Sequence, residues 1–265
     1  MSYSSLTNVL VQHLVDQGFF TGWSATAGTP MPSAKPVVGI LSGDDLSSQR
    51  VSKSLSGAVS ALGYRVVTFQ YANEQSDMVS AVTRMEANGV THLITADSSL
   101  YFFRAVAQSQ HFHPRLGVST YNGLQTLIAT QDPTSLVGTV GIGWNPSLDV
   151  NDAQDPGDVG PGEKQCLADL AAGGQTFSGK RFAEAVGLAI CDGVHLAALG
   201  ARAGHGLDPE AIRSGIVSLG AEFPVAGSFA SGLSSTSFGL PGAARNVIWD
   251  TGCGCFRYVG ATFPV

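Results

Sequence analysis

Short apolar segments alternate with amphipathic ones between Lys35 and Trp144, and few folds accommodate such an alternation. The apolar segments have the composition of buried β-strands and cover residues 36–41, 64–71, 91–95, 115–119 and 136–142. The amphipathic segments between them are predicted helices at 47–62, 77–88, 100–110 and 124–130. Near-continuous apolar strands that alternate with helices are typical of a parallel sheet covered on both faces. The pattern therefore predicts an α/β fold with a doubly wound parallel sheet lobe at residues 35–145.

Two further parts flank this lobe. Residues 1–34 are predicted to be a helix closed by Gly18 and a linker rich in Gly, Thr, Pro and Ser. Residues 146–265 are predicted to be a helical region that begins with an acidic crossover loop and ends in a β-hairpin. Its expected elements are helices at 163–172, 181–203 and 208–219 and strands at 245–250 and 255–259. Asp208 and Pro209 suit the N-cap and the first position of the last helix.

The predicted helix at 181–203 carries apolar or small side chains on nearly all sides. Such a helix is normally buried on most of its faces. Two helices and a hairpin are too little to surround it, so we expect an interface here, with a second copy of the chain as its cover. The expected assembly is a two-fold homodimer.

Charge and hydropathy exclude some partners and leave the compartment open. The chain has 14 Lys and Arg against 20 Asp and Glu, and the net charge of -6 opposes binding to nucleic acid. The sequence contains no run of 18 apolar residues and no signal peptide, which predicts no membrane span. As written, the chain is expected to be cytoplasmic; it would be extracellular or membrane-associated if it is a fragment of an exported protein.

The sequence lacks the motifs of several well-known catalytic and binding sites. The sequence has no nucleophile elbow and no phosphate-binding loop, so it predicts neither that hydrolase chemistry nor nucleotide binding. The acidic crossover, with Asp149, Asp152, Asp155 and Asp158, lacks the spacing of an EF-hand, and we interpret it as a solvated loop. We expect no metal site and no cofactor.

The cysteines do not settle the compartment. They lack zinc-ligand spacing, and they lie at positions 166, 191, 253 and 255. Two disulfides and buried free thiols remain equally compatible with their even number.

Several phrases in the sequence resemble the type I periplasmic binding proteins, in the branch of ABC importers that binds branched-chain amino acids and amides. They include LVDQGFF, AKPVVGIL, GYRVVTFQY, GVTHLITADSSLYFFRAVAQSQHFHPRLGVSTYNG and GWNP. The tail, with AEAVGLAICDGVHLAALGARAG and WDTGCGCFRYVG, is similar to actinobacterial members. Members of this family begin with another α/β half-sheet, so the resemblance implies a chain that lacks the N-terminal lobe. It is either a fragment or a natural half-protein that pairs with another chain.

Ligands of parallel doubly wound sheets lie outside the carboxyl ends of the strands. The candidate ligand-binding residues follow the predicted strands and also include one aromatic residue of a following helix. They are Ser42, Gly43, Asp44, Asp97, Ser98, Ser99, Phe102, Tyr121, Asn122, Trp144 and Asn145. Helix capping is the simpler explanation for several of the polar ones. The resemblance implies that the loops hold the polar head of a ligand.

Three functions remain open on this basis. The first is a small-molecule binding protein for a neutral, zwitterionic or apolar ligand. The second is a cytosolic enzyme that reuses the cleft, such as a cyclase or isomerase of an actinobacterial natural-product pathway, with Asp97, Asp44 and Tyr121 as acid-base candidates. The third is a sensor whose ligand controls dimerisation.

Overall fold

The computed structural model describes residues 3–72, 75–96, 100–109, 111–157, 162–236, 239 and 241–265. The chain forms two compact units. The sheet unit consists of Tyr3–Ile142 and Asn246–Arg257. The helical unit contains Gly143–Arg245 and Tyr258–Val265.

Among the described residues, seven strands form one sheet in the order β4-β3-β5-β6-β7-β8-β9. The strands are β3 (Val37–Gly43), β4 (Arg65–Tyr71), β5 (His92–Thr95), β6 (Arg115–Ser119), β7 (Val140–Gly143), β8 (Ala243–Asp250) and β9 (Cys255–Pro264). The pairs β3–β4, β3–β5, β5–β6 and β6–β7 are all parallel, and Val38 lies between Val66 and His92. The prediction of an α/β fold with a mainly parallel sheet is confirmed.

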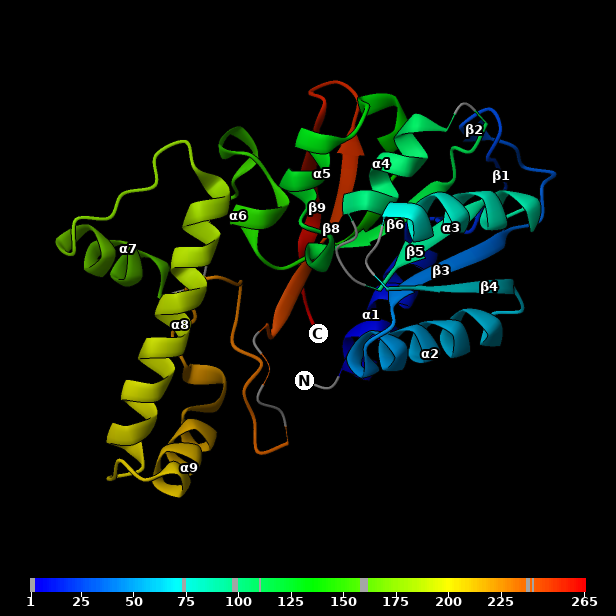
Figure 1. The fold of residues 1–265 in the computed structure, drawn as a ribbon. Helices are drawn as coiled ribbons and strands as arrows, with labels where there is room; N and C mark the ends of the chain where they lie inside the picture. The colour runs from blue at the N-terminus through cyan, green and yellow to red at the C-terminus, as the bar shows by residue number, and fades with distance from the viewer. Residues whose placement is uncertain are drawn as a thin grey trace. The chain divides into compact units, whose positions relative to one another are not determined.

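Helices cover both faces of the parallel strands (Figure 1). The elements are α1 (Tyr3–Asp16), α2 (Leu46–Ala61), α3 (Gln75–Ala87), α4 (Leu100–Gln108) and α5 (Leu124–Thr130). Helices α1 and α2 pack together on one face, and α3, α4 and α5 pack in sequence on the other. The strand glycines show the two layers, because Gly117 faces Leu14 of α1 and Gly39 faces Met85 of α3.

The strand order places a topological switch point between β3 and β5. The chain moves from β3 outward to β4, returns past β3 to β5, and continues through β6 to β7. Connections on opposite faces therefore diverge at the carboxyl ends of β3 and β5, and this is where open α/β sheets bind ligands.

Local chemistry explains where the elements begin and end. Asp45 caps α2, because its carboxylate accepts hydrogen bonds from the backbone of Ser47 and Ser48. The strand predicted at 136–142 is wrong in its first half: Pro133–Leu136 is a 3-10 helix (η2) capped by Asp132, and β7 starts only at Val140. Proline fixes the φ angle of this turn, and the Asp132 side chain accepts from Thr134 N at 2.9 Å. The predicted linker contains a small hairpin, β1 (Trp23–Ser24) with β2 (Thr29–Pro30).

His92 is a fully buried histidine at the start of β5. Its Nε2 lies 3.0 Å from the carbonyl oxygen of Thr21, and its ring meets Phe19 edge to face. Burial lowers the pKa of His92 to about 4, helped by the positive charge of Arg115, against the hydrogen bond to Thr21. The imidazole is therefore neutral in the folded protein.

We expect the sheet unit to lose stability as the pH falls from 6.5 to 4. The unfolded chain binds a proton at His92 in this range and the folded chain does not, so the loss reaches roughly 3 kcal/mol near pH 4. Urea denaturation across this range measures it. The His92→Gln variant keeps a neutral hydrogen-bonding side chain and should lack this component, whereas an unchanged pH slope in the variant would refute the assignment.

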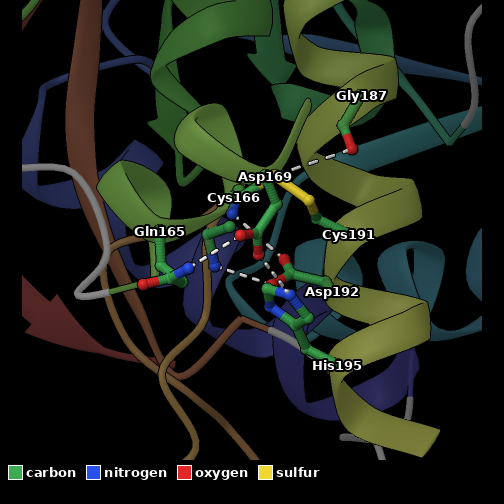
Figure 2. Close-up of a disulfide and its surroundings, with 9 residues drawn as sticks. Gln165, Cys166, Asp169, Gly187, Cys191, Asp192 and His195 are labelled. Carbon is green, nitrogen blue, oxygen red and sulfur yellow. Dashed lines mark hydrogen bonds and ion pairs between the residues drawn. A yellow bond between two sulfur atoms is a disulfide. The ribbon is translucent and has the colours of Figure 1, made fainter. Parts of the chain in front are cut away.

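The helical unit is built around one long helix. Its elements are α6 (Pro146–Asp149), α7 (Glu163–Ala172), α8 (Arg181–Ala203), α9 (Pro209–Leu219) and two short 3-10 helices, η3 (Asp152–Gln154) and η4 (Gly220–Glu222). Asp208 caps α9 as predicted and accepts from Glu210 N and Ala211 N. Helices α8 and α9 lie side by side (Figure 1). A disulfide between Cys166 and Cys191 joins α7 to α8 (Figure 2).

One face of α8 is exposed and apolar. It carries four side chains at helical spacing, which we name the α8 stripe: Phe182, Val186, Ile190 and Val194. They are 64%, 43%, 59% and 61% exposed. By length and composition, α8 could cross a membrane, with a mean hydropathy of 1.5 over its most apolar window. Within the structure 28% of that window is buried, including the disulfide-bonded Cys191 and the carboxylate of Asp192, and an ionisable group in hydrocarbon is costly.

Candidate functional site

The end of β3 carries the first predicted site residues. Ser42 and Gly43 lie within the strand instead of after it, because β3 continues two residues beyond the predicted end. Ser42 is fully buried, and its hydroxyl has no hydrogen-bond partner among the described residues. Asp44 is exposed, and its carbonyl oxygen accepts from Gln49 Nε2 at 2.5 Å. This end of the strand thus offers a buried hydroxyl and an exposed carboxylate.

The end of β5 is described only in part. Asp97, Ser98 and Ser99 lie outside the described residues. Phe102 of α4 does not line a cleft: its side chain is 0% exposed and meets Phe103 edge to face in the core. Its prediction as a ligand contact is corrected on this ground, because a ring with no accessible surface cannot touch a ligand.

Tyr121 and Asn122 follow β6 in a short 3-10 helix, η1 (Thr120–Asn122), and have different roles. Asn122 is buried and structural, since its Oδ1 accepts from Ser119 N at 2.7 Å and its amide donates to Thr95 Oγ1 at 2.5 Å. Tyr121 is 44% exposed and borders a cavity of about 20 Å³. The cavity is mostly apolar, and its other lining residues are Leu6, Thr7, Leu10, Val51, Leu55, Thr95, Ala96 and Ser119. This volume suits a single water molecule.

Trp144 and Asn145 border a much larger cavity of the helical unit, which is partly open to solvent. Its volume is about 330 Å³, and we name it the Trp144 cavity. The other lining residues come from α8 and from a loop after α9: Ala189, Asp192, Gly193, Leu196, Gly227 and Ser228. Known small-molecule sites begin at about 300 Å³ and combine apolar walls with a few polar groups. Two residues predicted from the sequence thus lie together in a cavity of that kind.

Asp192 holds one wall of the Trp144 cavity in place. Its carboxylate oxygens accept hydrogen bonds from Ala226 N at 2.6 Å and Gly227 N at 3.0 Å. Asp192 projects from α8 one residue after the disulfide cysteine, toward the same side as His195 (Figure 2). Burial raises the pKa of Asp192, against the two backbone hydrogen bonds that lower it. The side chain fixes the 226–227 backbone and brings an acceptor to the cavity.

Asn145 adds a second polar group. Its Oδ1 is buried and has no hydrogen-bond partner among the described residues, and its backbone N–H donates to Asp149 Oδ2 at 3.0 Å. A buried amide oxygen without a partner costs free energy unless a ligand or water donates to it. This oxygen is itself buried, so Asn145 borders the cavity through its other atoms.

The acidic crossover next to Asn145 differs from the prediction of a solvated loop. Asp149 is 0% exposed and accepts a hydrogen bond from the Tyr258 hydroxyl at 2.7 Å. Burial, and then the negative charge of Asp149, raise the pKa of Tyr258. Asp152 and Asp155 pair with Arg181 of α8 at 3.3 and 2.7 Å. Asp158 lies outside the described residues. The crossover is thus tied to α8 and β9, and it supports the loop that carries Asn145.

The sequence did not identify Asp192, Gly227 and Ser228 as site residues. The one available signal was an aspartate in the middle of an apolar helix, since a buried carboxylate needs partners. Within the described ranges, no group of three or more His, Cys, Asp or Glu side chains is placed to hold a metal ion.

Comparison with solved structures identifies the fold. Neither protein-family models nor curated proteins match the sequence. The fatty acid ABC transporter substrate-binding protein from Thermomonospora curvata is similar, with a TM-score of 0.65 and 14% identity over 99% of this chain and 63% of its own. A branched-chain amino acid ABC transporter protein from Thermus thermophilus, solved with bound valine, has a TM-score of 0.65 and 15% identity over 100% of this chain and 66% of its own.

A third similar structure is an ABC transporter substrate-binding protein from Desulfitobacterium hafniense in complex with Leu. Its TM-score is 0.53 at 16% identity, over 97% of this chain and 65% of its own. This chain therefore spans somewhat less than two thirds of the length of these proteins. Identities this low show the fold. The chain has the fold of the type I periplasmic binding proteins, the substrate-binding proteins of ABC transporters.

Proposed function

We propose that this protein binds a small neutral or zwitterionic molecule in the Trp144 cavity without changing it chemically. The observation that carries the proposal is the cavity itself, of about 330 Å³, with an indole, an amide and a carboxylate on its walls. The fold supports it, because two of the similar solved structures are named as substrate-binding proteins and a third contains bound valine.

The lining suggests the chemistry of the ligand. Leu196, Ala189 and the indole of Trp144 suit an aliphatic part. The Asp192 carboxylate accepts hydrogen bonds, so it suits an ammonium or amide group. Ser228 adds a hydroxyl that donates or accepts. An aliphatic molecule with a polar, hydrogen-bond-donating end fits this arrangement.

Titration calorimetry of the whole protein with L-valine, L-leucine and dodecanoate tests the proposal. We choose these probes because solved relatives of the fold are named for a fatty acid or contain valine or Leu. Saturable one-site heat with L-valine or L-leucine, and recovery of that probe unchanged, is the expected result, whereas heat with the anionic dodecanoate alone would contradict a neutral or zwitterionic ligand. Conversion of the probe would support the alternative of an enzyme, and the absence of heat with all three would count against this ligand class.

We also propose that two copies associate through the α8 stripe. Its four side chains are each at least 43% exposed and are all apolar. One helix face can pair with its own copy about a two-fold axis, since the same residues then meet on both sides. Contiguous exposed apolar patches of this kind often mark interaction surfaces.

Replacing Ile190 with glutamate should convert the dimer to a monomer, because it puts two like charges into the paired stripe. Light scattering after size-exclusion chromatography measures the mass. Val79→Glu is the matched control, because Val79 is 56% exposed on α3, a helix of the sheet unit that contributes nothing to the stripe. A monomeric parent protein, or a dimer that survives Ile190→Glu, would refute this interface.

The disulfides support the proposal that the protein is located in an oxidising compartment. The structure pairs Cys166 with Cys191 and Cys253 with Cys255. Disulfides persist in secreted and periplasmic proteins and are rare in the cytosol. We therefore favour the extracellular or membrane-associated location over the cytoplasmic one.

A further inference from the structure

The turn between β8 and β9 contains two cysteines separated by one glycine. Cys253 and Cys255 form a disulfide with a sequence separation of 2, and Gly254 between them has a φ of 61°. The Cys253 side chain is exposed and that of Cys255 is 2% exposed. An external thiolate therefore has freer access to Cys253 than to Cys255.

The other disulfide of the chain is buried and closes a longer loop. Cys166 and Cys191 are 0% and 6% exposed, and their sequence separation is 25. A disulfide that closes a longer loop restricts the unfolded chain more, so folding stabilises it more. Folding thus protects Cys166–Cys191 from reduction, both by burial and by loop length, and protects Cys253–Cys255 far less.

The turn has supports that do not depend on its disulfide. Arg257 Nε pairs with Asp250 Oδ2 at 2.5 Å, and Asp250 Oδ1 accepts from Gly252 N at 2.8 Å. Trp249 and Phe256 meet edge to face at 5.2 Å between ring centroids. These contacts join the two strands on both sides of the cysteines, so the hairpin can keep its shape after reduction. The Arg257 charge also offsets that of Asp250 next to Cys253.

We propose that Cys253 and Cys255 form a thiol–disulfide exchange site whose substrate is an external dithiol. A thiolate of the dithiol attacks Cys253 Sγ, the Cys253–Cys255 bond breaks, and Cys255 leaves as a thiolate that takes a proton from solvent. The second thiol of the dithiol then loses its proton and attacks the dithiol sulfur that is now bonded to Cys253. This step releases Cys253 as a thiolate, which takes a proton from solvent. Two electrons and two protons pass from the dithiol to the cysteine pair, and the dithiol becomes a disulfide.

Reduction of the full chain by dithiothreitol tests this site, with Cys166–Cys191 as the internal control. Samples equilibrated at graded ratios of reduced to oxidised dithiothreitol are quenched with acid and alkylated, and each cysteine pair is quantified by mass spectrometry. Cys253–Cys255 should be half reduced at a ratio at least tenfold lower than Cys166–Cys191, with an unchanged far-ultraviolet circular dichroism spectrum after the dithiothreitol is removed. Reduction of both pairs at one ratio, or of Cys166–Cys191 first, would overturn the proposal.

The order of attack has its own test. The Cys255→Ser variant leaves the exposed thiol of Cys253, and Cys253→Ser leaves the buried thiol of Cys255. In the folded variants, Cys253 should react with 5,5′-dithiobis(2-nitrobenzoate) at least tenfold faster than Cys255. Equal rates would contradict Cys253 as the attacked sulfur.

Discussion

Replacement of Gly215 with alanine is expected to destabilise the helical unit by about 3 kcal/mol or more. A Cβ atom at Gly215 of α9 would lie 1.8 Å from the carbonyl oxygen of Gly200 and 2.6 Å from Gly204 N, both on or next to α8. Those neighbours are backbone atoms, so no side chain can rotate away and the two helices must separate. Urea denaturation followed by far-ultraviolet circular dichroism measures the loss.

Gly193→Ala is the matched control for this substitution. Gly193 lies in α8, and a Cβ there meets no atom within 4 Å. Alanine should raise the stability of the unit by up to about 1 kcal/mol, because it favours the helical conformation over glycine. Equal effects of the two substitutions would show that α8 and α9 do not approach each other through Gly215.

Replacement of Trp144 with alanine is expected to weaken binding of the probe that binds the parent protein by about 30-fold, or roughly 2 kcal/mol. The indole is 6% exposed and forms part of the cavity wall, so its loss removes apolar contact with the ligand and widens the cavity. Titration calorimetry measures the change, and the far-ultraviolet circular dichroism spectrum should remain that of the parent.

Two other variants separate binding from packing. Trp144→Phe keeps an aromatic ring and should retain most of the affinity. Trp249→Phe changes a tryptophan of the sheet unit that packs on Phe256, and it should leave affinity unchanged. If Trp144→Ala binds as tightly as the parent, Trp144 is not part of the site.

The sequence predicted the fold well because its elements are determined locally. The apolar runs of β3, β5 and β6 have nearly every side chain buried, which produces a strong and continuous signal. Helices α7, α8 and α9 were predicted almost to the residue. For α9, Asp208 and Pro209 mark the start of the helix in the sequence. Strand β7 was predicted too early, because apolar residues such as Leu136 and Val137 also occur at the end of a capped 3-10 helix.

The site was harder to predict because burial and long-range contacts decide it. Phe102 lies in α4, the helix that follows β5, and its side chain points into the core. Asp192 joins the site only through the backbone of Ala226 and Gly227, more than 30 residues away, as the separations of 34 and 35 show. Asp149 was predicted to be a loop residue, and its contact with the distant Tyr258 could not be read from the sequence.

Fluorine nuclear magnetic resonance of protein labelled with 5-fluorotryptophan tests the ligand cavity most directly. The chain has three tryptophans, and Trp23 and Trp249 belong to the sheet unit while Trp144 borders the cavity. Single Trp→Phe variants assign the three resonances. On addition of L-valine, L-leucine or dodecanoate, the Trp144 resonance should shift along a saturable curve while the other two stay in place. A saturable shift of Trp23 or Trp249 with none at Trp144, or no shift with any of the three compounds, would contradict binding in this cavity.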